Sequence, residues 1–169
     1  MVLANQVDFQ LGDNFAVGAG ALIPALVVVK AKASIKASEL LHLGLAAHQY
    51  FPFYDEGSFT HPYAIVTVGD RERYLSFTGG YWIERYRYFD NGPDVYPMIT
   101  VGGSFAFTSN WRFFAEAAAV LQAGSNIVLP TFNFSNLSAS GRGMFEFGIM
   151  ALPDAQIPVL PILSYHRLF

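Results

Sequence analysis

The sequence predicts an all-β protein, a single antiparallel transmembrane β-barrel of about 10–12 strands that covers residues 1–169. Two observations carry this prediction. Apolar residues recur with period two along most of the chain, which is the periodicity of a strand. Hydrophobic residues make up 53% of the chain and charged residues 14%, whereas a soluble domain has about 25% charged residues. Something apolar other than a protein core therefore has to absorb the excess.

Period-two alternation divides the chain into about eleven predicted strands of roughly eight to twelve residues each, separated by Gly, Asp, Asn and Ser turns. The stretches with the clearest pattern are, in order, residues 7–11, 27–36, 41–48, 64–77 (a hairpin around 69–72), 96–122 (a hairpin around 108–110), 128–138, 144–149 and 163–169. Transmembrane strands need about 9–11 residues, whereas globular strands have about five or six. Strand length therefore favours a membrane barrel.

The longest uncharged apolar stretch, FAVGAGALIPALVVV at residues 15–29, is a poor candidate for a spanning helix. Such a helix needs roughly 20 apolar residues. This stretch is shorter, contains Gly18, Gly20 and Pro24, and ends in β-branched residues, which favour strands.

The two faces of the predicted strands differ in chemistry. One face is nearly uncharged, while the other collects small residues, hydroxyls and charges, as in a barrel with an apolar outer band and a polar lumen. The residues predicted to line the lumen are Lys30, Lys32, Lys36, His42, His48, Arg112, Glu116, Glu146, Ser164 and His166. Their charges either form ion pairs that fill a closed lumen or line a narrow pore. We favour the closed lumen, because no predicted loop is long enough to constrict a wide pore.

The predicted connections fall into two sets. Short turns follow the odd-numbered strands, whereas the connections after even-numbered strands include the long, aromatic-rich segments at residues 50–62 and 83–97. This asymmetry is typical of a bacterial outer-membrane barrel and assigns the C-terminus to the periplasmic rim. The loop aromatics are the sequence hint for a protein partner, at Tyr54, Phe59, Tyr86, Tyr88 and Phe89.

Aromatic residues near the predicted strand ends are expected to form interfacial girdles. One rim would carry Tyr50, Phe51, Phe53, Tyr54, Tyr63, Tyr81, Trp82, Tyr86, Tyr88 and Tyr96, and the other Tyr74, Phe107, Trp111 and Phe113.

The chain ends in VLPILSYHRLF, with Leu163, Tyr165 and Phe169 on one face. This resembles the terminal-strand signal that outer-membrane barrels present to the barrel-insertion machinery, although Arg167 and the prolines in this strand depart from it. A wider stretch, FTHPYAIVTVGDRERYLSFTGGYW followed by YPMITVGGSFAFTSNWRFFAEAAAVL, is similar in layout to uncharacterised outer-membrane barrels of the Bacteroidota type. The resemblance implies a fold and an outer-membrane location, and no established activity.

Eleven strands are an unusual number, because single-chain bacterial barrels have even counts and an unpaired edge is not tolerated in lipid. Three explanations are open at this point. One short strand is missed, the chain lacks upstream sequence such as an N-terminal strand, or a partner closes the seam.

The predicted function is structural or porin-like, a barrel that presents surface loops or passes small solutes. No enzyme activity, metal or cofactor is expected: Cys is absent, and His42 and His48 are about 20 Å apart along one strand. The ten Lys and Arg residues form no run, so we expect no nucleic-acid partner. Alternatives are an accessory subunit that binds another outer-membrane protein, a soluble β-sandwich, and a lipid hydrolase in which Ser164, His166 and Glu146 act together.

Overall fold

The computed structural model describes residues 2–23, 25–54, 57–70, 72–86, 92–122, 125–138, 143–151 and 159–168. Side chains are not described for residues 2–4, 22–23, 125 and 166–168 within those ranges. The described residues form eleven strands, which confirms the predicted strand count. No helix in these ranges is long and apolar enough to cross a membrane.

The strands are nine to thirteen residues long, slightly longer than the eight to twelve residues predicted from the alternation. Their bounds are β1 (Val2–Gln10), β2 (Phe15–Ile23), β3 (Leu26–Lys36), β4 (Leu41–Pro52), β5 (Ser58–Gly69), β6 (Arg73–Arg85), β7 (Asp94–Ala106), β8 (Trp111–Gln122), β9 (Ser125–Leu137), β10 (Gly143–Ala151) and β11 (Val159–Leu168). Residues 15–29, the doubtful helix, belong to β2 and β3.

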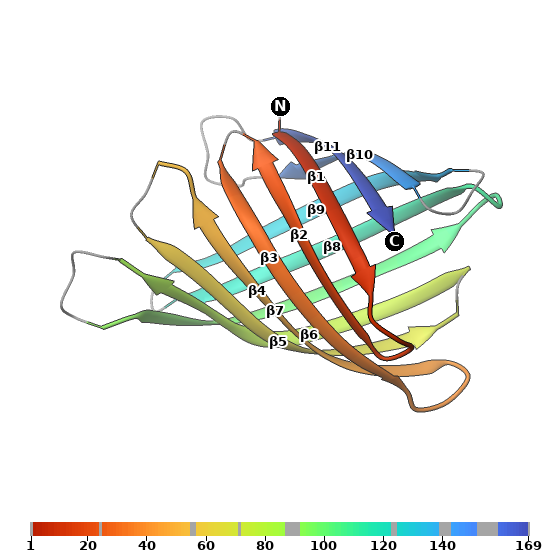
Figure 1. Cartoon of the computed structure of the whole chain (residues 1–169), viewed down its shortest axis with the longest axis horizontal. Helices are drawn as coiled ribbons and strands as arrows, with labels where there is room; N and C mark the ends of the chain where they lie inside the picture. The colour runs from red at the N-terminus through yellow and green to blue at the C-terminus, as the bar shows by residue number, and fades with distance from the viewer. Residues whose placement is uncertain are drawn as a thin grey trace.

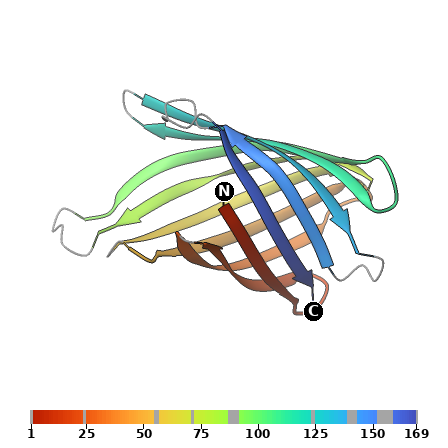
Figure 2. The same ribbon diagram turned by 90° about the horizontal axis from the view of Figure 1, so that it is seen from above.

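The sheet closes on itself as a barrel in which β1 pairs with β2 on one side and with β11 on the other. Consecutive strands are antiparallel, and the β1–β11 pair is parallel, with a register from Val2 opposite Ile162 to Asp8 opposite Leu168. Figures 1 and 2 show the red β1 and the blue β11 side by side, with their arrows in the same direction. A single barrel of this kind excludes the β-sandwich alternative.

None of the three explanations for the odd strand count is needed for closure. When consecutive strands alternate in direction, the first and the eleventh strand run the same way, so a parallel pair is the geometry available to join them. A parallel ladder uses the backbone N–H and C=O groups of both edges. The alternation within the two terminal strands does not predict this parallel pair.

The faces of the barrel follow the predicted chemistry. Residues paired across strands share a face and alternate along each strand, and the outward residues include exposed apolar side chains on every strand whose side chains are described. Charged residues at outward register positions of the described strands stand at strand ends: Arg73 and Arg85 of β6 and Arg167 of β11. Polar residues, in contrast, are among the most buried, including His61, Thr100, Thr131, Ser135 and Ser164.

An aromatic band on the outside of β7–β10 supports one of the two predicted girdles. Ring centroids are 6.1 Å apart for Phe105 and Phe113, 5.2 Å for Phe113 and Phe134, and 5.5 Å for Phe134 and Phe147. Trp111 contacts Phe147 edge to face at 6.1 Å. These rings lie near the rim that carries the turns after β7 and β9.

Several aromatic residues predicted for the girdles face the lumen instead, so that part of the girdle prediction is wrong. They are Tyr50, Tyr63, Tyr74, Trp82 and Tyr96. Proximity to a strand end was the basis of the prediction, but the period of two decides the face, and these five stand at inward positions.

The long connections are shorter than predicted, because the strands continue into them. β4 extends to Pro52 and β5 begins at Ser58, while β6 extends to Arg85 and β7 begins at Asp94. The connections after β2 and β8 are as short as the turns on the opposite rim. The difference in loop length between the rims is therefore smaller than the sequence suggested, although short turns do follow every odd-numbered strand from β1 to β9.

Candidate functional site in the barrel lumen

A bridge between β1 and β3 crosses the inner surface of β2. Lys30 Nζ lies 2.9 Å from Asp8 Oδ1 and 3.1 Å from Asp8 Oδ2, and it also donates to Gln6 Oε1. The bridge passes over Gly18 and Gly20, which are paired with Asp8 and Gln6. A Cβ at Gly18 would meet Asp8 Oδ1 and would lie 2.7 Å from Lys30 Cε. Because Gly18 and Gly20 have no side chains, Lys30 can reach across β2 to β1.

His48 stands beside this bridge, directly opposite Lys30. Its Nδ1 is 3.0 Å from the hydroxyl of Tyr50, and its Nε2 is 3.0 Å from the hydroxyl of Tyr63. A neutral imidazole has one donor and one acceptor nitrogen, so one tyrosine donates to His48 and the other accepts from it. Both ring nitrogens are therefore satisfied inside the lumen.

Three further rings complete what we call the aromatic layer, made of His48, Tyr50, Phe59, His61, Tyr63 and Trp82. Phe59 stacks on Trp82 with centroids 5.4 Å apart, and His61 stacks on Tyr63 at 4.6 Å. Tyr50 also contacts Trp82 at 5.4 Å. Trp82 Nε1 donates to Glu84 Oε1 over 2.9 Å, which fixes the indole at the rim of the layer. Together with the Lys30 bridge, these side chains occupy the lumen along β1–β6, apart from a cavity of about 180 Å³ beside Lys30, His48 and Tyr50.

Below the aromatic layer, toward the short-turn rim, the lumen contains a cavity of about 430 Å³ lined by residues of β3–β8. Most of its polar lining consists of hydroxyl groups, among them Thr67, Ser76, Thr78 and Thr100. Thr67 and Ser76 are hydrogen bonded to each other at 2.9 Å. Lys32 and Glu116 bring charges of opposite sign from β3 and β8. We call this space the inner cavity.

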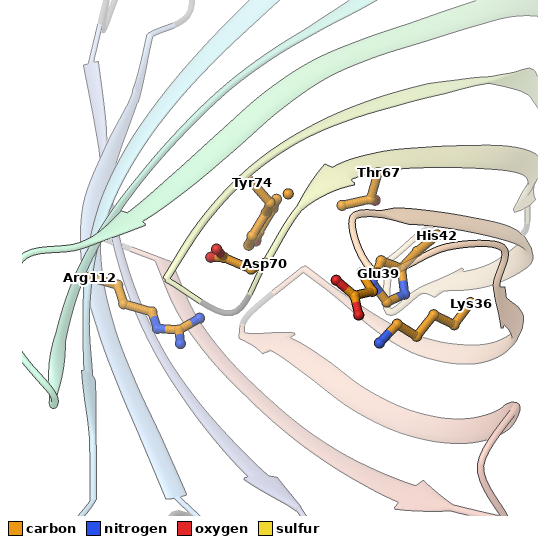
Figure 3. Close-up of a pocket in the computed structure, with 8 residues that line it drawn as sticks. Lys36, Glu39, His42, Thr67, Asp70, Tyr74 and Arg112 are labelled. Carbon is orange, nitrogen blue, oxygen red and sulfur yellow. The ribbon is translucent and has the colours of Figure 1, made fainter.

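A second cavity of about 530 Å³ adjoins the inner cavity at the short-turn rim and shares His42, Thr67 and Tyr74 with it. Figure 3 shows this mouth, with Lys36, Glu39 and His42 on one side, Arg112 on the other, and Asp70 and Tyr74 between them. The shared lining residues make the two cavities one vestibule that opens at the rim formed by the turns after β3, β5 and β7.

The turn at the mouth is held by Asp70. Its Oδ1 accepts hydrogen bonds from the backbone N–H groups of Glu72 at 2.8 Å and Arg73 at 2.9 Å. These two bonds, the one from Arg73 first, hold the pKa of the Asp70 carboxyl below its usual range. Asp70 therefore stays ionised at neutral pH, at a mouth that Lys36 and Arg112 also line.

Ser164 and Glu146, which the sequence associated with hydrolysis, are in contact. Ser164 Oγ donates to Glu146 Oε2 over 2.9 Å, and Ser164 is only 6% exposed on the inner surface. In a Ser–His–acid arrangement the serine contacts the histidine and the acid orients that histidine, whereas here the hydroxyl donates directly to the carboxylate. The side chain of His166 lies outside the described residues, and its backbone pairs with Gln6 and Met144.

The predicted lumen residues with described side chains occupy inward register positions, but they do not form one site. Lys30 belongs to the bridge and His48 to the aromatic layer. Lys32 and Glu116 line the inner cavity. The mouth is lined by Lys36, His42 and Arg112. Within the described part of the chain no group of three His, Asp or Glu side chains is placed to hold a metal ion.

Sequence reasoning missed the acidic partner of Lys30 and the aromatic residues that surround His48. Asp8 was not among the residues predicted to line the lumen, and Tyr50 and Tyr63 were assigned to the outer girdle. The available signal was Gly18 and Gly20: two glycines at alternate positions of one strand mark a surface without side chains, which a long cation on the neighbouring strand can cross.

The residues predicted to meet other proteins that the structure describes, Tyr54, Phe59 and Tyr86, stand at the rim that carries the connections after β4 and β6. Tyr54 is 88% exposed in the connection after β4, and Tyr86 donates to Glu84 Oε2 over 2.8 Å. Phe59 lies in the aromatic layer rather than in a loop. Tyr88 and Phe89 lie outside the described residues. Of the predicted insertion signal, Leu163 and Tyr165 stand at outward positions of β11, and Phe169 is outside the described residues.

Comparison with known proteins gives no relative from which a function could be carried over. No protein-family model matches the chain, no curated protein is similar to it, and no solved structure matches it. The resemblance to outer-membrane barrels of the Bacteroidota type therefore stays a prediction.

Proposed function

We propose that the chain is an integral β-barrel of a bacterial outer membrane with a structural role. One observation carries the proposal: between the strand ends, outward register positions of the described strands hold no charged residue, while many large apolar side chains there are 36% to 67% exposed. A surface of this kind is unstable in water and is what an acyl-chain environment requires. The eleven described strands leave no open sheet edge, which is the second requirement for a spanning sheet.

A lumen sealed at one level fits this role better than an open pore. The Lys30 bridge and the aromatic layer occupy the inside of β1–β6, and the vestibule lies on one side of them. In this proposal the barrel seals the membrane and presents its rims, without catalytic activity. The Ser164 hydroxyl, directed at Glu146, supports a structural hydrogen bond.

The membrane proposal is tested by flotation and gel mobility of the same preparation. Cells that express the chain are lysed, and membranes are floated on a density gradient. The extracted protein is then run in SDS with and without boiling. We expect flotation with the membranes and a compact species that changes mobility only on boiling. Recovery in the soluble fraction with one mobility would contradict the proposal.

Planar-bilayer conductance separates the sealed lumen from a small pore. A sealed barrel gives no steady current after insertion, whereas a pore gives discrete current steps. The variant Lys30→Met, which removes the bridge while leaving the outer face unchanged, is the matched comparison. Steady current from the unmodified protein would favour the porin-like alternative.

The proposed orientation assigns the short-turn rim, and with it the C-terminal end of β11, to the periplasm, and it includes the barrel-insertion machinery as a transient partner. Its support is that β11 ends beside the turns that follow odd-numbered strands. Single cysteines at Ser109 and Tyr54 test it, because the chain has no native Cys. An impermeant thiol reagent added to intact cells is expected to label Tyr54→Cys and not Ser109→Cys. The opposite pattern would reverse the orientation.

An accessory role is the second candidate, and the exposure of Tyr54 favours it. A tyrosine that is 88% exposed next to Phe53, itself 51% exposed, is a suitable anchor for another outer-membrane protein. Co-purification in mild detergent that is lost in Phe53→Ser/Tyr54→Ser would support this role. Unchanged co-purification, or none, would count against it.

A further inference from the structure

The inner cavity has an unpaired charge on each of two opposite sides of the barrel. Glu116 on β8 and Lys32 on β3 both line it, and neither has a hydrogen bond or ion pair with any residue in the described ranges. The Lys30–Asp8 pair shows the contrast, since its two charges neutralise each other a short distance away. A half-buried carboxylate without a partner is unfavourable, and a bound cationic group relieves that cost.

The backbone of β7 fixes where the Glu116 side chain lies. Gly102 is paired with Glu116, and a Cβ on Gly102 would lie 3.3 Å from both Glu116 Cβ and Cγ. The stem of Glu116 therefore lies against the bare backbone of β7, in space that a side chain at position 102 would occupy, and Glu116 lines the cavity from this position. Such preorganisation lowers the cost of holding a ligand.

Hydroxyl groups cover the wall between the two charges. Thr67, Ser76, Thr78 and Thr100 come from three adjacent strands, β5, β6 and β7. A hydroxyl can both donate and accept, so this wall solvates either end of a polar ligand. At about 430 Å³ the cavity is within the size range of small-molecule sites, and the mouth cavity connects it to the short-turn rim.

We propose that the inner cavity binds a small dipolar solute, one that carries an ammonium group and a carboxylate separated by a few carbons. Its ammonium group lies on Glu116 and its carboxylate on Lys32. A simple anion or a simple cation leaves one of the two charges without a partner, so both bind less well. The inference rests on the proposed barrel with a water-accessible vestibule and adds the class of solute that enters it.

Protection of a cysteine in the cavity tests the proposal. Thr78→Cys gives the only thiol in the protein, and the protein folded in lipid vesicles or detergent is labelled with iodoacetamide. Three probes of matched length compete with the label at equal concentration and ionic strength: 4-aminobutyrate, butylammonium and butyrate. We expect 4-aminobutyrate to slow labelling most.

Two charge-removing variants give the specificity of the effect. In Glu116→Gln the advantage of 4-aminobutyrate over butyrate disappears, and in Lys32→Met its advantage over butylammonium disappears. Each lost advantage corresponds to about tenfold in apparent affinity, as for a hydrogen bond to a charged group. Lys36→Met, at the mouth, is the control and keeps both preferences. The boiling-dependent gel mobility of each variant shows that the barrel is folded.

Equal protection by all three probes, no protection, or a Thr78→Cys thiol that does not react would each overturn the dipolar-solute proposal. These outcomes are separate from a failure of the membrane proposal. A barrel that floats with membranes and shifts mobility on boiling, but shows no preference for 4-aminobutyrate, refutes only the solute. A protein recovered in the soluble fraction refutes the membrane barrel.

Discussion

Replacing Val101 with lysine tests whether the outer face of the barrel contacts lipid. Val101 is an outward residue of β7 and is 43% exposed. It lies five residues before Ala106, the last residue of that strand. At about 3.4 Å per residue and a strand tilt of about 40°, this corresponds to a depth of about 13 Å. The apolar band of such barrels is about 25 Å tall, so Val101 stands near its middle.

The expected cost follows from that depth. A lysine at the midplane of a transmembrane barrel lowers the free energy of unfolding by about 2–4 kcal/mol, a change of roughly 30- to 700-fold in the unfolding equilibrium constant. On a water-exposed surface the same substitution changes stability by about 0.5 kcal/mol or less. The assay is reversible urea unfolding of the purified protein in lipid vesicles, followed by tryptophan fluorescence and by gel mobility.

Val68→Lys is the matched control, because it places the same side chain on a strand at similar exposure but different depth. Val68 is outward and 48% exposed, one residue from the end of β5. Near an interface the cost of lysine falls to about 0–1 kcal/mol. If Val101→Lys and Val68→Lys lower stability equally, to within about 0.5 kcal/mol, the cost does not depend on depth and the lipid-facing assignment is refuted.

Three further predictions concern the inside of the barrel and its turns. Gly18→Ala should destabilise the barrel by about 1–3 kcal/mol in the same unfolding assay, because its Cβ would lie 2.8 Å from a backbone carbonyl of β1. Gly79→Ala, where a Cβ has no neighbour within 4 Å, should show no such loss. Ser164→Ala should lower stability by about 1–2 kcal/mol, since Glu146 loses a hydrogen bond. The same variant should leave lipid ester hydrolysis at background, and activity lost with it would favour the hydrolase instead. The stability difference between wild type and Asp70→Asn should be constant above the ordinary aspartate pKa of about 4, because the folded pKa of Asp70 is lowered. It should shrink as the pH falls through that lowered value, and a difference that grows on acidification would contradict the turn assignment.

The strands and their faces were accessible from the sequence because both depend on a local pattern. A period of two assigns each residue to a face once the strand is located, so Lys30, Glu116 and Ser164 could be assigned to the inner face without knowledge of their partners. Residues 15–29 were recognised as unsuitable for a helix from local signals, their glycines and β-branched residues.

The closure of the barrel and the ends of the strands could not be read in the same way. Pairing of β1 with β11 joins residues at opposite ends of the chain, and nothing in the local pattern of either strand marks a parallel partner. Turn residues and aromatics such as Tyr50 were taken as the ends of strands, although the inward period continues through them. Loop length and girdle membership were misjudged for this reason.

The candidate site was predicted only as a set of inward residues. The division of that set into the aromatic layer and the vestibule depends on tilt and stagger, which bring β3 and β8 to the same cavity. Strand pairing also determines which charges meet: Lys30 forms an ion pair with Asp8, whereas Lys32 has no partner among the described residues. These are three-dimensional properties of the barrel and have no counterpart in residue spacing.

The measurement that tests the central claim most directly is a cysteine cross-link across the β1–β11 seam of the protein refolded into vesicles. Asn5 and Tyr165 are opposite each other in the parallel register, and adjacent strands bring such partners within disulfide range. We expect oxidised Asn5→Cys/Tyr165→Cys to form an intramolecular disulfide and to keep its compact, boiling-sensitive mobility. The offset pair Val7→Cys/Leu163→Cys, four residues out of register and about 13 Å apart, should not form one. Cross-linking of the offset pair, or of neither pair, would contradict a barrel closed by this parallel seam.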